Sequence, residues 1–110
     1  MGYRSDVIIA LNEKIIFRDL VTQEIPKIIK ELPFSKGFNA TYYKVEDWKW
    51  YHDYTDVREI EDYFFKLSEE DEILFGAIRV GESAGDIEEW GNPHEYELYA
   101  QTSIDCPVGF

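Results

Sequence analysis

An uninterrupted run of β-branched and aliphatic side chains near the N-terminus constrains the fold of this chain more than any other segment. The run Val7-Ile8-Ile9-Ala10-Leu11 is short enough for a buried strand and too short for a typical helix. Residues 6–11 therefore predict a first, interior strand. The chain has 110 residues, of which 45% are apolar, and this content fills one core but not two. We expect a single compact domain spanning residues 1–110.

The next apolar pattern predicts a helix that ends near Leu32. Its apolar side chains are spaced by three and four positions, as on one face of a helix: Phe17, Leu20, Val21, Ile25, Ile28, Ile29 and Leu32. Pro26 interrupts the pattern. With Thr22 as the N-cap, the proline falls near the first turn, where its missing N–H costs less.

A hairpin is the alternative for the same region. Residues 7–11 would pair with residues 14–17 through a turn at Asn12 and Glu13. The dipeptide Asn-Glu lacks the glycine that a tight hairpin turn prefers. The pattern therefore favours the helix.

Three later segments predict further strands. Residues 38–51 are dense in aromatic and β-branched side chains and indicate a strand pair with its turn at residues 46–47. Residues 73–80 have strand character, and residues 81–93 are typical of a polar loop. Residues 95–104 alternate, as in an antiparallel strand with one solvated face, with one side formed by Tyr96, Leu98, Ala100 and Thr102.

A second helix is predicted between these strands. Its apolar side chains recur at helical spacing after the capping residues Thr55 and Asp56, at Val57, Ile60, Phe64 and Leu67. The resulting order is strand, helix, strand pair, helix, strand, strand. It predicts an α+β fold in which a small antiparallel sheet of about five strands carries two helices on one face. A ferredoxin-like or related sandwich is the simplest match.

The charge of the chain limits its partners. Eleven Lys and Arg stand against 23 Asp and Glu, which gives a formal net charge of −12. Cationic side chains are needed to replace counterions on phosphate backbones and anionic membranes, so we expect no direct binding to either. The chain has no run of about 18 apolar residues and no signal-peptide core, and its single Cys106 forms no internal disulfide. These features predict a soluble cytoplasmic protein.

Groups that carry catalysis are sparse. The histidines His52 and His94 lie in no recognisable triad motif with Cys106 or a serine. We therefore expect neither an enzyme nor a bound cofactor. The carboxylate clusters are dense enough for a hard cation, but their spacing is not that of an EF-hand, and a solvated surface is the expected state. The clusters contain Glu69, Glu70, Asp71, Glu72, Glu82, Asp86, Glu88 and Glu89.

An aromatic band could supply a binding surface. It consists of Tyr42, Tyr43, Trp48, Trp50, Tyr51 and Tyr54. One reading is that the rings surround a small core with only their polar tips in water. The other is a hot spot for a protein partner, because Trp and Tyr are enriched in such sites.

Several segments of the chain resemble a family of small acidic proteins encoded by bacteriophages and prophages. The resemblance rests on residues 1–7 (MGYRSDV), residues 48–51 (WKWY) followed by residues 56–57, residues 78–82 (IRVGE) and residues 86–89 (DIEE). It implies a viral origin and an uncharacterised role. No functional residues follow from it.

These features lead to the hypothesis of a phage-encoded modulator or inhibitor in the bacterial host cytoplasm. It would bind a host protein with a basic, nucleic-acid-handling surface by DNA mimicry, for example a defence nuclease. The predicted contact residues are Trp48, Trp50, Tyr51, Glu69, Glu70, Asp71, Glu72, Glu82, Asp86, Glu88 and Glu89. The alternatives are a small carboxylate-based metal-dependent enzyme or ligand-binding domain, and a virion structural or assembly component.

Overall fold

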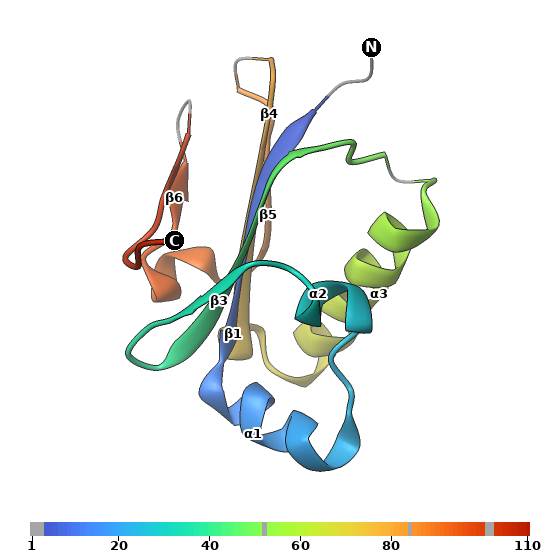
Figure 1. The fold of residues 1–110 in the computed structure, drawn as a ribbon, viewed down its shortest axis with the longest axis vertical. Coiled ribbons are helices and arrows are strands. Elements are labelled where there is room, and N and C mark those ends of the chain that lie inside the picture. The colour runs from blue at the N-terminus through green and yellow to red at the C-terminus, as the bar shows by residue number, and fades with distance from the viewer. Residues whose placement is uncertain (1–3, 52, 84, 101–102) are drawn as a thin grey trace.

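The protein, described here from a computed structural model, is an antiparallel sheet covered on both faces (Figure 1). The structure describes residues 4–51, 53–83, 85–100 and 103–110. Within them, the five strands of the sheet run in the order β2-β3-β1-β4-β5, and their bounds are β1 (Ser5–Asn12), β2 (Phe34–Lys36), β3 (Ala40–Trp48), β4 (Phe75–Gly81) and β5 (Ile87–Gly91). The fold is therefore of the predicted α+β class.

Three α-helices and a C-terminal segment supply the other two layers in this described part of the chain. The helices are α1 (Glu13–Thr22), α2 (Lys27–Lys30) and α3 (Thr55–Glu70). The remaining elements are the short 3-10 helices η1 (Glu72–Leu74) and η2 (Pro93–Tyr96) and the ribbon strands β6 (Tyr99–Ala100) and β7 (Ile104–Asp105). Within the described ranges, no helix has the length and apolar content that crossing a membrane requires.

The central strand β1 is buried on both faces. Val7, Ile9 and Leu11 pack toward the helices, whereas Ile8 and Ala10 pack toward the C-terminal segment. All five side chains are at most 2% exposed. A strand with two buried faces needs no polar alternation, which explains the continuous apolar run. The predicted first strand is confirmed and extends one residue further at each end.

The first helical region differs from the predicted helix. Asn12 is the N-cap of α1, and its side chain accepts the N–H of Lys14 at 2.9 Å, so the hairpin alternative is wrong. Thr22 is the last residue of α1 rather than an N-cap, because Gln23 adopts a left-handed conformation with φ 50° and ends the helix. Pro26 then precedes the separate helix α2, which suits a residue without an N–H.

The docking of α1 leaves an apolar face in solvent. Its buried residues are Ile15 and Asp19. The Asp19 carboxylate accepts the N–H of Ile25 at 2.8 Å and pairs with Lys30 at 2.7 Å, so polar bonds hold α1 to α2. The prediction that the first part of the apolar stripe faces the core is wrong, because the chain turns at residue 23, and the exposed side chains are Phe17, Leu20 and Val21.

Strand β3 runs through the residues where a turn was predicted. The hairpin turn lies at residues 37–39, between β2 and β3, and residues 46–47 belong to β3. The pairing of β3 with β1 shifts its register between Ser5 and Val7, and Asp47 has φ 56°. The polar residues 46–47 therefore mark a β-bulge, and the predicted turn is wrong.

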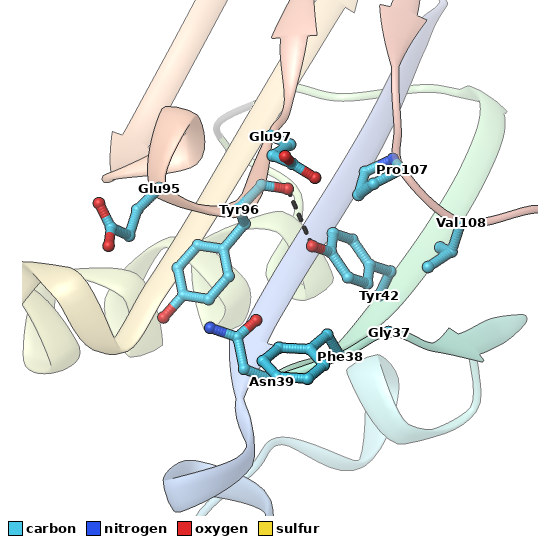
Figure 2. Close-up of a pocket in the computed structure, with 9 residues that line it drawn as sticks. All are labelled: Gly37, Phe38, Asn39, Tyr42, Glu95, Tyr96, Glu97, Pro107 and Val108. Carbon is cyan, nitrogen blue, oxygen red and sulfur yellow. Dashed lines mark hydrogen bonds between the residues drawn. The ribbon is translucent and has the colours of Figure 1, made fainter.

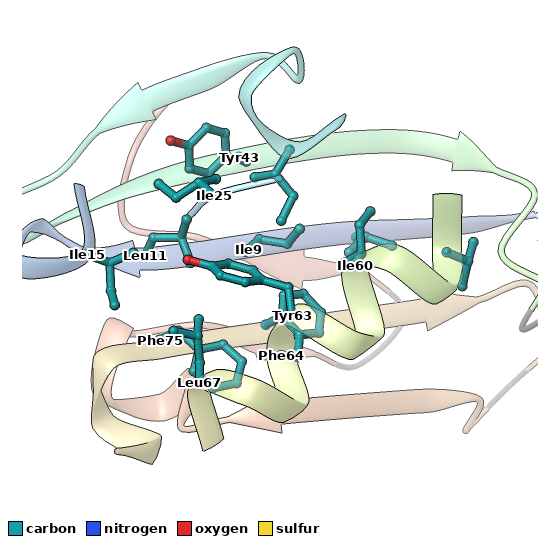
Figure 3. Packing of buried hydrophobic residues seen from close by; sticks show 14 of the residues in the cluster. Ile9, Leu11, Ile15, Ile25, Tyr43, Ile60, Tyr63, Phe64, Leu67 and Phe75 are labelled. Atoms are coloured by element: carbon teal, nitrogen blue, oxygen red, sulfur yellow. The ribbon is translucent and has the colours of Figure 1, made fainter. Parts of the chain in front are cut away.

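Helix α3 is the helix that the apolar spacing predicts. Val57, Ile60, Phe64 and Leu67 are fully buried against the helix-facing side of the sheet. Ile60, Phe64 and Leu67 are labelled in Figure 3. The ring of Phe64 stacks on that of Phe75 in β4, with 5.3 Å between their centroids. Helix α3 begins at Thr55, but its N-cap is Tyr54, whose side chain makes no capping hydrogen bond, so the predicted capping by Thr55 and Asp56 is wrong.

The C-terminal segment covers the second face of the sheet (Figure 1). The strand predicted for residues 95–104 is wrong: the described part of this segment forms η2 and then strands β6 and β7, and Thr102 lies outside the described residues. Tyr96 and Leu98 are at most 1% exposed and belong to the same buried cluster as Ile8 and Ile78. The apolar side chains of this segment alternate because Tyr96 and Leu98 are buried against the sheet, although the segment is not one of the strands of that sheet.

The fifth strand of the sheet is β5, within the segment that was predicted to be a polar loop. β5 pairs with β4 from Ile87 opposite Val80 to Gly91 opposite Gly76, so the loop prediction is wrong for these residues. The strand lies at the edge of the sheet, where one side of the backbone has no neighbouring strand among the described residues. Its polar composition suits this position.

Candidate functional site

The first acidic cluster lies where α3 ends. Glu69 and Glu70 are the last residues of the helix, Asp71 is its C-cap and Glu72 begins η1. All four side chains are exposed. Asp71 also caps η1, and Glu70 accepts a hydrogen bond from Arg18 of α1 at 2.9 Å. Part of this predicted binding cluster therefore has structural contacts of its own.

The second acidic cluster contains the counterions of a buried cation. Arg79 is 6% exposed; its Nη2 lies 2.7 Å from Asp86 Oδ1, its Nε 2.8 Å from Glu88 Oε1, and its Nη1 2.8 Å from Ser5 Oγ. Burial alone lowers the pKa of Arg79, but the hydrogen bonds and charges of Asp86 and Glu88 outweigh burial and raise that pKa above its usual value. These two carboxylates, 33% and 34% exposed, therefore stabilise the β4–β5 pair.

Glu82 and Glu89 are the exposed members of the second cluster. Glu82 accepts the backbone N–H of Arg4 at 3.0 Å and so joins the start of β1 to the β4–β5 turn. Glu89 lies in the middle of β5, with one carboxylate oxygen 3.6 Å from Nε2 of His94. Glu89 therefore places a charge at the edge of the sheet.

Some residues of the aromatic band are buried in the core, and the others lie at the surface. Trp50 is 5% exposed and meets Trp48 edge to face, with 5.1 Å between the ring centroids. Trp48 and Tyr51 are partly exposed, and Tyr54 is 44% exposed. The predicted contact residue Trp50 thus lies inside the protein, and the buried members of the band are Tyr42, Tyr43 and Trp50.

A groove between α3 and β5 brings exposed aromatic and acidic side chains together. Its volume is about 390 Å³, and it is lined by Arg58, Glu61, Asp62, Phe65, Ser68 and Trp90. Phe65 is 68% exposed. The Trp90 ring lies 5.3 Å from the buried Phe64 ring, so the groove has a rigid aromatic wall. We call this feature the α3–β5 groove.

Charged residues surround the α3–β5 groove. Glu59, Asp62 and Glu69 are exposed on α3, at spacings that place them along the outer side of the helix, together with Lys66. Glu89 of β5 points to the other face of the sheet, toward His94, and does not border the groove. A groove with aromatic walls and a largely acidic surround can attract a cationic partner and hold it by aromatic contact.

Sequence reasoning missed both aromatic residues of the groove. Phe65 follows Phe64 and lies off the buried stripe of α3, so the periodicity that places Phe64 inside also places Phe65 outside. This signal was present in the sequence. Trp90 had no such signal, because its position on β5 depends on pairing with Ala77 of β4.

A second pocket, of about 420 Å³, lies on the opposite face of the sheet (Figure 2). It is bounded by residues 37–39, by η2 and by the C-terminal tail. The Tyr42 hydroxyl donates to the backbone carbonyl of Tyr96 at 2.8 Å, and burial raises the pKa of Tyr42 to about 12. Glu95 and Glu97 also line the pocket, so it combines aromatic rings with carboxylates.

The candidate catalytic and metal-binding residues are dispersed. Among the residues that the structure describes, no three or more His, Cys, Asp and Glu side chains are placed to hold a metal ion. Cys106 is partly buried, and burial raises the pKa of its thiol, which disfavours a reactive thiolate. His94 stacks on Tyr99 with 5.0 Å between ring centroids, and His52 lies outside the described residues.

Comparisons with family models, with curated proteins and with solved structures find no match for this chain, so its function is inferred from its own surface.

Proposed function

We propose that this chain is an acidic binding protein that occupies a basic, nucleic-acid-handling surface of a host protein. The observation that carries the proposal is the α3–β5 groove, where Phe65 and Trp90 lie beside the carboxylates of Glu61 and Asp62, with Arg58 as the one cation among the described residues of the lining. The net charge of −12 supplies long-range attraction to a cationic surface. The aromatic side chains supply short-range affinity, which is the usual division between steering and hot spots.

Helix α3 is the element that supports DNA mimicry. It holds Glu59, Asp62 and Glu69 on one rigid scaffold, so their charges keep fixed separations, as the phosphates of a duplex do. A protein that binds phosphates through Arg and Lys can accept carboxylates in the same positions. The basic surface of a defence nuclease is the partner that this chemistry suits.

The setting of this function is part of the proposal. The resemblance to small acidic phage proteins supports a phage origin, and the partner would then belong to the bacterial host cytoplasm.

We also propose that the fold belongs to the ferredoxin-like group. Its support is the order β1, helices, β2, β3, α3, β4, with β5 added at the edge of the sheet.

The test begins with capture of the partner from host lysate and continues with stopped-flow association rates at low and high salt. The variant Glu59→Gln/Asp62→Asn/Glu69→Gln should associate more slowly than the parent, and high salt should reduce the difference, because exposed charges act over about 10 Å at 0.1 M ionic strength. The matched control Glu95→Gln/Glu97→Gln/Asp105→Asn removes the same charge from exposed residues of the C-terminal segment. Equal rates for both triple variants would remove the α3 carboxylates from the binding mechanism.

A second candidate function is the binding of a small cationic ligand in the pocket of Figure 2. The combination of Tyr42 and Tyr96 with Glu95 and Glu97 favours it, because aromatic faces and carboxylates both attract cations. Thermal melts with arginine, spermidine, Mg²⁺, Ca²⁺ and Mn²⁺ test it, since selective binding to the folded state raises its stability. A melting temperature that no additive raises would exclude these ligands.

A further inference from the structure

The backbone of β5 directs hydrogen-bonding groups away from the sheet. The N–H of Gly81 donates to the carbonyl of Asp86 at 2.8 Å, so Gly81 and Asp86 are a hydrogen-bonded pair. From this pair onward, hydrogen-bonded and non-hydrogen-bonded residue pairs alternate along β4 and β5. Glu88 and Trp90 therefore direct their backbone groups toward β4, and Glu89 between them directs its N–H and carbonyl outward. No strand in the described part of the chain lies beyond β5.

The two edges of the sheet differ in how open they are. The edge strand β2 has three residues, follows Pro33 and ends with Lys36, which are features that discourage pairing with another strand. Strand β5 has five residues, contains no proline or lysine, and borders the α3–β5 groove. β5 is thus the edge better suited to receive another strand.

The α3–β5 groove lies where a side chain of an added strand would point. A residue opposite Trp90 would share its face of the sheet and lie about 5 Å from it, on the side of α3. That face is bounded by Glu61, Asp62 and Phe65, and by Arg58 at the start of α3. An arginine there can stack on the Trp90 ring while its guanidinium bonds to the Asp62 carboxylate.

The negative charge of the protein indicates which kind of segment binds at the β5 edge. The net charge of −12 and the exposed Glu89 favour an approaching segment that is basic. A second copy of the chain would bring the same negative charge to the same edge, with Glu88 and Glu89 near their counterparts. A basic segment therefore fits the edge better than a second copy does.

We propose that β5 accepts an extended, arginine-bearing segment of the partner as a sixth strand of the sheet, with the arginine opposite Trp90 in the α3–β5 groove. The inference rests on the proposed function and specifies how the partner is held. Backbone hydrogen bonds supply affinity in this mode of recognition, and the groove supplies specificity for the side chain.

The test uses a short blocked peptide of alternating arginine and valine as the probe. Its matched control is the same peptide with N-methyl groups on the backbone amides that would face β5, which keeps the charge and removes the donors. The unmethylated peptide should bind about tenfold more tightly in calorimetry, because the control loses strand hydrogen bonds. In hydrogen-exchange NMR, it should also slow exchange of the Glu89 and Gly91 amides.

Two variants of Glu89 separate the contribution of its backbone N–H to peptide binding from the contribution of its charge. Glu89→Pro removes an outward N–H and leaves the β4 ladder intact, whereas Glu89→Gln keeps the N–H and removes the charge. The proline variant should lose the tenfold preference for the unmethylated peptide, and the glutamine variant should keep it. If Glu89→Pro does not fold, as judged by circular dichroism, the two peptides on the parent protein still decide the question.

The outcomes distinguish this inference from the proposed function. Equal, salt-sensitive binding of both peptides overturns strand addition and leaves the acidic binding function in place. Binding of neither peptide counts against both. Slow exchange of the Glu89 and Gly91 amides in a dimer without peptide, seen at high protein concentration, overturns the inference in favour of a second copy.

Discussion

The ring of Phe64 on α3 stacks on the ring of Phe75 on β4, with centroids 5.3 Å apart and planes inclined by 24°. The same Phe64 ring lies 5.3 Å from Trp90 of β5. One side chain of the helix therefore contacts both strands beside the α3–β5 groove. Because Phe64 and Phe75 are fully buried, this contact fixes the position of the groove wall.

Replacement of Phe64 should destabilise the fold severely. Phe64→Ala removes a fully buried ring and leaves a cavity, so the free energy of unfolding should fall by about 3–5 kcal/mol in urea denaturation. The neighbouring Phe65→Ala is the control, because its ring is 68% exposed, and it should cost less than about 1 kcal/mol. Similar losses for the two variants would contradict the packing of α3.

Gly76 should tolerate no side chain. A Cβ at this position of β4 would lie 2.6 Å from the Cα of Pro93 and 2.8 Å from the carbonyl oxygen of Asn92, so the backbone before η2 would have to move. Gly76→Ala should cost about 1–3 kcal/mol. Gly109→Ala, where nothing lies within 4 Å of the added Cβ, should leave the melting temperature unchanged. A parental melting temperature for Gly76→Ala would show that η2 is not held against β4.

Arg79 should be needed for the β4–β5 pair. Arg79→Met leaves Asp86 and Glu88 close together without their cation, and should lower the free energy of unfolding by about 2 kcal/mol. This figure lies below the usual cost of breaking a buried pair because both carboxylates are partly exposed. Glu89→Gln, which removes the exposed carboxylate next to Glu88 on β5, is the control and should change stability by about 0.5 kcal/mol or less. Equal stability of the two variants would show that the Arg79 network is dispensable.

Tyr42 should make the protein less stable at alkaline pH. Burial, followed by the nearby charges of Cys106 and Glu97, raises its pKa from 10.0 to about 12. Between these values the unfolded chain loses the phenolic proton while the folded chain keeps it. The resulting stabilisation is therefore complete below pH 10 and is lost as the pH rises toward 12, at about 1.4 kcal/mol per pH unit for one proton.

The slope of stability against pH measures this effect. Urea denaturation of Tyr42→Phe at several pH values between 9 and 12 should show a slope that is shallower by one proton than that of the parent. The variant also loses the hydrogen bond to Tyr96, which lowers stability at every pH by about 1 kcal/mol without changing the slope. Parallel curves for the two proteins would mean that Tyr42 titrates alike in the folded and unfolded states.

The spacing of apolar residues correctly predicted those strands and helices whose apolar side chains are in fact buried by the rest of the fold. The run at residues 7–11 indicated a strand, and the stripe from Val57 to Leu67 indicated a helix; the structure confirms both. The same local rule was wrong for Phe17, Leu20 and Val21, because the stripe was extended across the chain reversal at Gln23. Periodicity shows which side chains share a face, but not whether another element covers that face.

The candidate site was only partly predictable. The sequence identified Glu69 and Glu89 as charges available to a partner, and both are exposed. It treated Asp86 and Glu88 in the same way, although the structure pairs them with Arg79. A carboxylate in a polar segment looks the same in a sequence whether it faces water or a buried guanidinium.

The sequence by itself determined the acidic character, the central strand and helix α3, because composition and short-range spacing are properties of the chain alone. Only the tertiary structure decided that residues 87–91 form an edge strand and that Phe65 and Trp90 line one groove. The physical reason is that the edge of a sheet is defined by the absence of a neighbouring strand on one side. Such a position depends on how all the other strands pair, and no local pattern of side chains encodes it.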